Sequence, residues 1–207
     1  MNSTIQIRLD TTPEQETRLR ELQREFAKAC NLLTPVVRET RCWNRVALHH
    51  MTYRTLREKF PQLGSQMACN AIYSVSRTCR LVYQSPDSPF NLTRLGTRPL
   101  PLVRLASDSP VYFDRHTLSL KDGHLSMFTL DGRMRFDIDL PEAAVRRFRE
   151  VKLREVLLAS HRPGFSLTLV FGAGNRRTAA PRRSSGELPE YVVVESETHD
   201  VPTGEPA

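Results

Sequence analysis

The sequence predicts an α+β protein, a small β-barrel with a three-helix insertion between its first and second strands. Three observations predict this fold. Residues 5–9 alternate apolar and polar side chains, as a half-buried strand does, and lead directly into helical sequence. Residues 13–84 follow a helical period, and short alternating strands begin near residue 100. Because a lone N-terminal strand needs partners, we expect it to pair with strands from the second half of the chain.

The first helix carries clear start signals. Thr12 can accept a hydrogen bond from the first turn, Pro13 suits the first helical position, and Gln15 completes a T-x-x-Q capping box. An apolar stripe at helical spacing follows, made of Leu19, Leu22, Phe26 and Leu33. One face of this helix is therefore expected to be buried.

Two further helices are predicted between residues 48 and 83, with Pro61 and Gly64 separating them. The apolar face of the first carries Leu48, Thr52, Leu56 and Phe60. The apolar face of the second carries Met67, Ala68, Ala71, Ile72, Val75, Cys79 and Val82. Residues 11–90 are accordingly assigned to a helical lobe.

The strands of the second half are short, and Asp122-Gly123 and Asp131-Gly132 are hairpin-turn signals between them. In the strand at 133–140, one face carries Met134, Phe136, Ile138 and Leu140, and the other carries Arg133, Arg135, Asp137 and Asp139. A short basic helix is expected at 142–155, followed by two more strands. Several short strands with one helix favour a small closed or nearly closed barrel, formed by residues 1–10 and 95–172.

The last part of the chain has a different composition. Residues 173–187 are rich in Gly, Pro, Ser and Arg, which is typical of a flexible linker. Residues 188–195 (LPEYVVVE) could form one more strand, and the remainder is an acidic tail expected to be disordered. Residues 173–207 are therefore assigned to a linker and tail.

The charge balance agrees with a nucleic-acid partner. The chain has 30 Lys and Arg against 23 Asp and Glu, and six of those acids lie in residues 187–207, which hold no Lys or Arg. The positive charge is thus concentrated in residues 1–186, mostly as arginine, which favours bidentate contacts with phosphates and bases. A solvated basic surface, or a codon bias toward arginine, is the alternative interpretation.

Other classes are disfavoured. The sequence has no apolar run of about 18 residues and no apolar signal core at its N-terminus, so a cytoplasmic location is expected. Its four cysteines form no C-x-x-C pair and its histidines show no metal-ligand spacing. Neither a metal nor another cofactor is predicted.

Several motifs occur in a consistent order in the first half. They are the leading strand, T-P-E-Q at 12–15, A-C-N at 29–31, Tyr53-x-x-Leu56-Arg57 and Pro61-x-Leu63-x-Ser65-Gln66. With these motifs, residues 4–84 resemble the N-terminal half of TnpB, the transposon-encoded RNA-guided nuclease, and of the type V CRISPR effectors. Residues 100–175 resemble it through their strand pattern only. The resemblance implies a wedge-like barrel with a helical recognition lobe, in a prokaryotic, nucleoid-associated protein.

In that family the lobe and the barrel read a short duplex DNA motif beside the target. Carried over by position, the DNA-contacting residues here are Tyr53, Arg57, Gln66, Met67, Asn70 and Arg115, the last in an Asp114-Arg115 pair. Their chemistry suits the task, because Gln and Asn can pair with adenine, Arg with guanine, and Met or Tyr can pack on a thymine methyl group. Ordinary helix packing is the alternative for Tyr53 and Met67.

A second group is expected to bind RNA through its backbone. It comprises Arg133, Arg135, Arg146, Arg147, Arg149, Lys152 and Arg154. Strand alternation exposes the first two, and the basic helix displays the others. They are predicted to grip a structured guide RNA or a guide–target duplex by shape and charge, as RNA-guided systems do. A solvated basic helix is the alternative.

In the resembled family a RuvC-like nuclease domain follows the barrel, and its three separated carboxylates hold two Mg²⁺ ions. This sequence shows no such domain, so no enzymatic activity is predicted, and Asp137 and Asp139 are interpreted as structural. The leading hypothesis is a nuclease-less RNA-binding protein of an RNA-guided DNA-targeting system. The alternatives are a subunit of a split nuclease, with a separate RuvC-like or other effector protein as partner, and a simple duplex-DNA-binding regulator.

Overall fold

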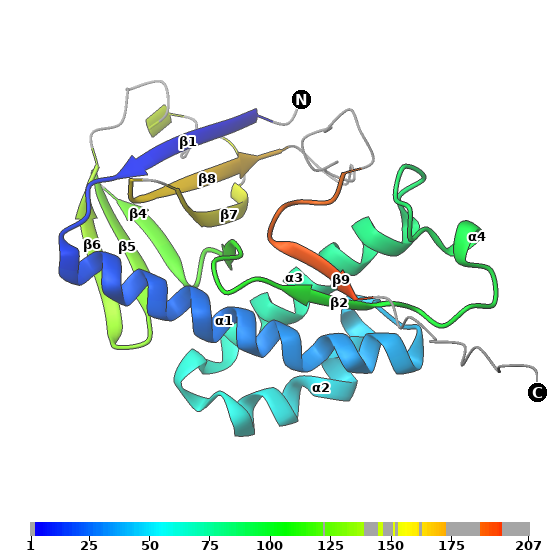
Figure 1. Cartoon of the computed structure of the whole chain (residues 1–207). Helices are drawn as coiled ribbons and strands as arrows, with labels where there is room; N and C mark the ends of the chain where they lie inside the picture. The colour runs from blue at the N-terminus through cyan, green and yellow to red at the C-terminus, as the bar shows by residue number, and fades with distance from the viewer. Residues whose placement is uncertain are drawn as a thin grey trace, which may run out of the picture.

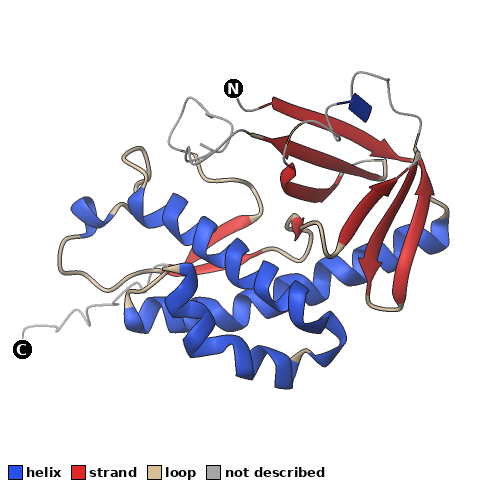
Figure 2. Ribbon diagram, turned by 180° about the vertical axis from the view of Figure 1, so that it is seen from behind, coloured by secondary structure: helices blue, strands red, loops and turns tan. Residues whose placement is uncertain are grey.

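The computed structural model describes residues 3–121, 123–138, 145–146, 151, 153–161, 163–172 and 187–195 (Figures 1 and 2). Its first half contains β1 (Ser3–Leu9), α1 (Pro13–Thr40), α2 (Arg45–Lys59), the 3-10 turn η1 (Pro61–Leu63), α3 (Gly64–Gln84) and the short α4 (Leu92–Leu95). Its second half contains β2 (Leu102–Leu105), β3 (Val111–Phe113), β4 (Leu118–Lys121), β5 (His124–Thr129), β6 (Gly132–Asp137), β7 (Leu153–Ser160), β8 (Phe165–Phe171) and β9 (Val192–Glu195). The protein is therefore of the α+β class, as predicted.

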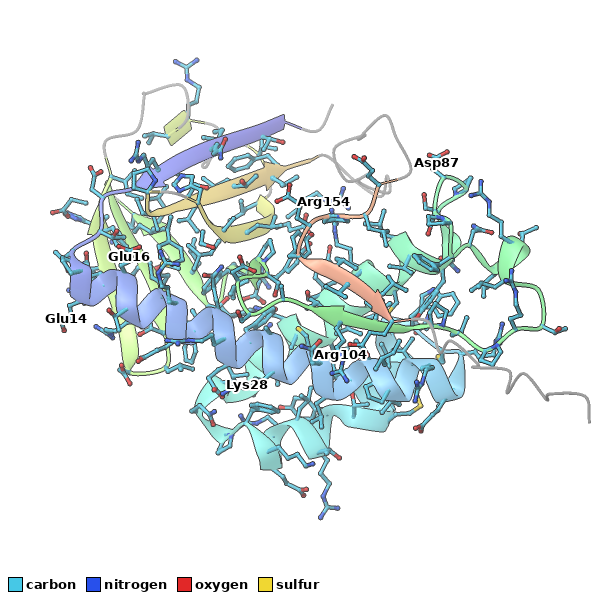
Figure 3. The ribbon with its side chains drawn as sticks, in the orientation of Figure 1. Glu14, Glu16, Lys28, Asp87, Arg104 and Arg154 are labelled. Atoms are coloured by element: carbon cyan, nitrogen blue, oxygen red, sulfur yellow. The ribbon has the colours of Figure 1, made fainter. Side chains whose placement is uncertain are left out.

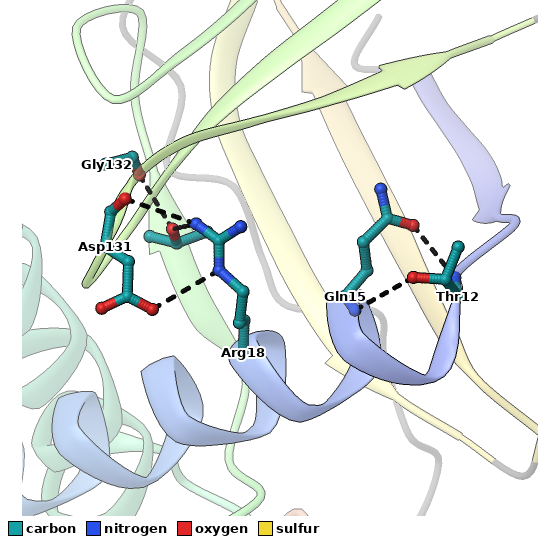
Figure 4. A network of polar contacts seen from close by, with 6 residues as sticks. Thr12, Gln15, Arg18, Asp131 and Gly132 are labelled. Carbon is teal, nitrogen blue, oxygen red and sulfur yellow. Dashed lines mark hydrogen bonds and ion pairs between the residues drawn. The ribbon is translucent and has the colours of Figure 1, made fainter.

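The start of α1 confirms the predicted capping box (Figure 4). The backbone N–H of Gln15 donates to Thr12 Oγ1 at 3.2 Å, and the Thr12 N–H donates to Gln15 Oε1 at 3.0 Å. One turn further along, Arg18 Nη2 donates to Thr129 Oγ1 at 2.9 Å, and Arg18 Nε lies 3.5 Å from the Asp131 carboxylate. These contacts fix the β5–β6 turn against the N-terminal part of α1.

The other two long helices, α1 and α2, pack against α3. This helix contacts α1, α2 and β3. The predicted apolar residues of α2, Leu48, Thr52 and Leu56, are buried. Ser76 donates from its hydroxyl to the Trp43 carbonyl at 2.6 Å, which ties α3 to the segment between α1 and α2.

The N-terminal strand pairs with the second half of the chain, which confirms the helices as an insertion. β1 runs antiparallel to β8, from Ser3 opposite Phe171 to Leu9 opposite Phe165. β8 continues to β7 and β7 to β3, giving the four-stranded order β1-β8-β7-β3. The strands β4, β5 and β6 form a separate sheet, and β2 pairs with β9 in a third.

The expectation of a single barrel is corrected by these ladders, because the described strands form three separate antiparallel sheets and no closed barrel. The packing of β2 shows one reason. Its Leu105 N–H and C=O are both bonded to the side-chain amide of Asn31, at 2.8 and 2.9 Å, so this strand is fastened to α1. Its ladder partner is β9, which lies in the segment 188–195 considered above as one more strand. An ion pair at 2.8 Å between Arg104 of β2 (labelled in Figure 3) and Glu195 of β9 joins the two strands.

One cluster of buried apolar side chains includes members from the helices and from all three sheets, among them Phe26, Tyr83, Phe165 and Phe171. Most of the basic helix expected at 142–155, the linker at 173–186 and the tail at 196–207 lie outside the described residues. Among the described residues, no helix combines the length and the apolar character needed to cross a membrane.

Candidate nucleic-acid interface

The β4–β5–β6 sheet has one buried face and one exposed face. The buried face carries Leu118, Leu125, Met127, Met134 and Phe136, and it lies on the side of α1. The opposite face, called the sheet face below, consists of Ser119, Lys121, His124, Ser126, Phe128, Arg133, Arg135 and Asp137. Directly opposed residues on neighbouring strands have their side chains on the same face of a sheet. The β5–β6 ladder pairs Phe128 with Arg133, Ser126 with Arg135 and His124 with Asp137, so these six side chains lie on one face.

Arg133 is held in place on the sheet face. Its Nε donates to Ser126 Oγ at 2.9 Å, its Nη2 donates to the Ser126 carbonyl at 2.9 Å, and its Nη1 donates to the His116 carbonyl at 3.4 Å. A guanidinium has five N–H donors, so two remain for an external acceptor such as a phosphate. The side chain is exposed and already ordered.

The acidic residue of the sheet face is paired. Asp137 Oδ1 lies 2.7 Å from His124 Nδ1, and the two side chains are 92% and 68% exposed. The structural interpretation of Asp137 stays a prediction, and Asp139 lies outside the described residues. Within the described residues, no three His, Cys, Asp or Glu side chains are grouped to hold a metal ion.

A turn between β3 and β4 connects the sheet face to the helices. Asp114 Oδ1 accepts from the backbone N–H groups of His116 and Thr117, at 3.0 and 3.1 Å, and Asp114 Oδ2 accepts from Gln66 Nε2 on α3. The turn exposes Arg115 and His116, and the His116 carbonyl is the one that Arg133 binds. Gln66, the turn and Arg133 are therefore hydrogen-bonded in series.

A second surface lies along α2 and the adjoining side of α3. This helical face consists of Arg45, His49, Tyr53, Arg57, Gln66, Cys69 and Tyr73, most of which are half-buried. Tyr53 stacks on His49 with ring centroids 4.6 Å apart and planes at 18°. A pocket of about 280 Å³ lies between the two helices, lined by Arg45, Val46, His49, Cys69 and Ile72.

Two of the predicted DNA-contacting residues do not lie on this surface. Met67 is 1% exposed and belongs to the core. Asn70 is 8% exposed, and its amide donates to Thr117 Oγ1 at 3.5 Å and to Met67 Sδ at 3.7 Å. Neither side chain is placed to touch a duplex, because α3 turns that side toward the β3–β4 turn. Tyr53, Arg57, Gln66 and Arg115 are at least partly accessible.

Only some of the predicted RNA-binding residues lie in the described part of the chain, and these are not all on one surface. Arg133, Arg135, Arg146 and Arg154 are exposed, whereas Arg147, Arg149 and Lys152 lie outside the described residues. Arg154 (labelled in Figure 3) was predicted on the basic helix, but it lies on strand β7, which belongs to the four-stranded sheet and not to the β4–β5–β6 sheet. The structure brings only Arg133 and Arg135 of this group together on one described surface.

A buried polar network holds the helical face against the four-stranded sheet. Glu155 on β7, 5% exposed, accepts from the Tyr73 hydroxyl at 2.7 Å and from Arg77 Nη1 at 3.0 Å. Burial, and then the Glu155 charge, raise the pKa of Tyr73 above its usual value, so its hydroxyl remains a donor. Burial likewise raises the pKa of Tyr112, whose ring meets that of Tyr73 at 5.4 Å. The network thus fixes the angle between α3 and β7.

Sequence reasoning missed part of the sheet face, namely Lys121, His124, Ser126 and Phe128, and the exposed His116. The signal was present, since the alternation of β5 puts His124, Ser126 and Phe128 on one side. The hairpin signal at Asp131-Gly132 was present too, and the pairing of β5 with β6 that it predicts puts these residues beside the two arginines. Neither a known protein family nor a curated protein matches this chain, so the resemblance to TnpB remains a prediction from residue patterns.

Proposed function

We propose that this chain is a nuclease-less RNA-binding protein of an RNA-guided DNA-targeting system. The sheets formed by residues 1–10 and 95–172 hold a structured guide-type RNA, with the sheet face as a main contact. The helical lobe, residues 11–90, docks a DNA duplex beside a short motif through the helical face. The proposal that the RNA guides DNA targeting rests on the resemblance of residues 4–84 to TnpB. The proposal that the chain binds nucleic acid is supported by its sheet face and its helical face.

The observation that carries the proposal is the hydrogen-bonded series from Gln66 through the Asp114 turn to Arg133. It joins the helical face and the sheet face through one short rigid turn. A protein that places an RNA beside a duplex needs two such surfaces at a fixed distance, because the guide must reach the strand next to the motif.

Charge and side-chain type support the assignment of partners. The sheet face carries Lys121, Arg133 and Arg135 against the single carboxylate of Asp137, which is paired with His124. Cations on an open surface attract phosphates irrespective of sequence. The helical face combines Arg57 with Tyr53 and Gln66, which are side chains able to contact base edges.

The test is to purify the full chain at low salt and to identify what it carries. A bound RNA is expected, giving an absorbance ratio of 260 to 280 nm well above that of protein alone, and sequencing should find one structured species. The double variant Arg133→Ala/Arg135→Ala should lose most of this RNA. A matched control, Arg24→Ala/Arg54→Ala, removes the same charge from exposed positions on α1 and α2 and should retain it.

Two results would contradict the proposal. A chain that elutes free of nucleic acid and does not bind RNA would overturn it. A chain that binds duplex DNA but not RNA would be the simple duplex-binding regulator. Binding of a RuvC-like partner to the RNA-loaded chain would instead identify the subunit of a split nuclease.

A further inference from the structure

We infer that the sheet face binds single-stranded RNA, with one base stacked on the ring of Phe128 and the neighbouring phosphates on Arg133 and Arg135. This inference rests on the proposed RNA-binding function and specifies the form of RNA that this surface takes. The RNA bound at the sheet face is expected to be an unpaired segment and not a helical stem.

The position of Phe128 carries the argument. Phe128 lies directly opposite Arg133 in the β5–β6 ladder, so its ring projects on the same side of the sheet as the arginines. It is half-buried and packs in part against the core, whereas its neighbours Met127 and Thr129 face the interior and are 0% exposed. An accessible aromatic ring on a sheet surface can stack with any base, because every base has a π-face.

The groups around Phe128 match an RNA strand. Arg133, ordered by Ser126 and the His116 carbonyl, keeps two N–H donors for a phosphate beside the ring. Arg135 is two residues further along β6, about 7 Å away in an extended strand. Lys121 and His124, opposite each other at the end of β4 and β5, continue the polar surface in the same direction. The surface therefore places one ring beside two arginines, with Lys121 and the His124–Asp137 pair at its far end.

An unpaired strand suits this arrangement better than a duplex. In a double helix the bases stack on one another and are not available to a protein ring, so a stem could use only the arginines. Phe128 packs in part against the core, and its accessible part lies beside the arginines, where an unpaired base can stack on it.

The test measures fluorescence anisotropy of two labelled probes, a 12-nucleotide single-stranded RNA and an RNA hairpin with a 12-base-pair stem. The variants are Phe128→Leu, which keeps an apolar side chain without the ring, and Phe128→Trp, which keeps a stacking ring. Phe128→Leu should weaken binding of the single strand by about 5- to 100-fold and leave the hairpin unchanged. Phe128→Trp should bind the single strand at least as well as the unmodified chain.

Failure of this inference can be told apart from failure of the proposed function. If the unmodified chain binds neither probe, nor RNA from its own cell, the proposed function fails. If it binds RNA and Phe128→Leu binds the single strand equally tightly, or loses both probes in parallel, only the stacking site is overturned. Thermal unfolding checks that each variant is folded; Phe128→Met replaces Phe128→Leu, and Phe128→Tyr replaces Phe128→Trp, where one is not.

Discussion

The helix α3 and the β4–β5–β6 sheet differ in how many sides they leave free. α3 contacts α1, α2 and β3, and twelve of its 21 residues are buried, including the polar Asn70, Ser74 and Ser76. The sheet packs one face on the side of α1 and leaves the other exposed. A substitution on α3 is therefore mainly a change in the core, whereas one on the sheet face changes what the surface can bind.

This difference restricts where the molecule can recognise a ligand. On a strand with one covered face, every second residue is free for binding without loss of packing. On a helix covered on several sides, a residue can contact a ligand only near an end or along a narrow open strip. On α3 that strip is represented by Gln66, Cys69 and Tyr73, which are half-buried.

The largest loss of stability is expected for Met67→Ala. Met67 is 1% exposed and fills the space between α3 and its neighbours. Removing it should lower the free energy of unfolding by about 2–5 kcal/mol, because the transfer energy is lost and a cavity remains. Chemical denaturation measures this loss. Met51→Ala on α2, where the side chain is 43% exposed, is the matched control and should change the free energy of unfolding by less than about 0.5 kcal/mol.

Unchanged stability of Met67→Ala would contradict the buried position of Met67. If Met67→Ala unfolds like the unmodified chain but binds a DNA duplex with altered sequence preference, the start of α3 faces DNA. The predicted role of Met67 as a DNA contact would then stand, and the packing of α3 described here would not persist in the complex.

A smaller effect is expected for Asn70→Ala. Its amide bonds to Thr117 Oγ1 and Met67 Sδ across a buried contact, so its loss should cost about 1 kcal/mol of stability. Preference for a flanking base pair should not change. Gln66→Ala, four residues earlier on the more open side, is the comparison variant and should weaken that preference in a competition assay. Equal loss of preference in both variants would contradict the buried position of Asn70.

Local elements could be predicted well from the sequence, because their signals lie within a few residues of one another. The capping box of α1, the breaks at Pro61 and Gly64, and the turn at Gly132 with its φ of +99° are all local. The insertion of the helices after the first strand followed from the need of that strand for partners. Pairing between distant strands could not be predicted, and the barrel was wrong for this reason. No residue close to β2 in the sequence indicates that Asn31 bonds to one edge of this strand and β9 to the other.

The candidate site shows the same limit. The exposure of Arg133 and Arg135 followed from alternation, since a strand has only two faces. The burial of Met67 and Asn70 depends on β3 and the turn at Asp114, which come more than 40 residues later in the chain. An apolar stripe shows that one side of a helix is buried, but it does not show how many of the polar positions beside the stripe are buried as well. Polar residues beside the stripe, such as Asn70, are therefore the hardest to assign.

The smallest effect on stability is expected for Arg135→Ala, on the exposed side of the sheet. The side chain is exposed and lies opposite Ser126, so its removal should change the free energy of unfolding by less than about 0.5 kcal/mol. Its effect on RNA binding should nevertheless be measurable. Each phosphate contact to a single strand contributes about 0.7 to the slope of log affinity against log salt, because condensed counterions are released. Arg135→Ala should reduce that slope by about this amount.

The control for this prediction is Arg54→Ala on α2. Arg54 is 93% exposed and pairs with Glu58 at 3.0 Å, so the variant removes the same charge from a surface outside the sheet face. Surface pairs of this kind contribute at most about 1 kcal/mol, and the slope of affinity against salt should hardly change. If Arg54→Ala reduced the slope as much as Arg135→Ala, RNA would be held by the overall charge of the molecule. A reduction confined to Arg135→Ala would instead mean that the sheet binds phosphates at a defined position while α3 and its neighbours maintain the core.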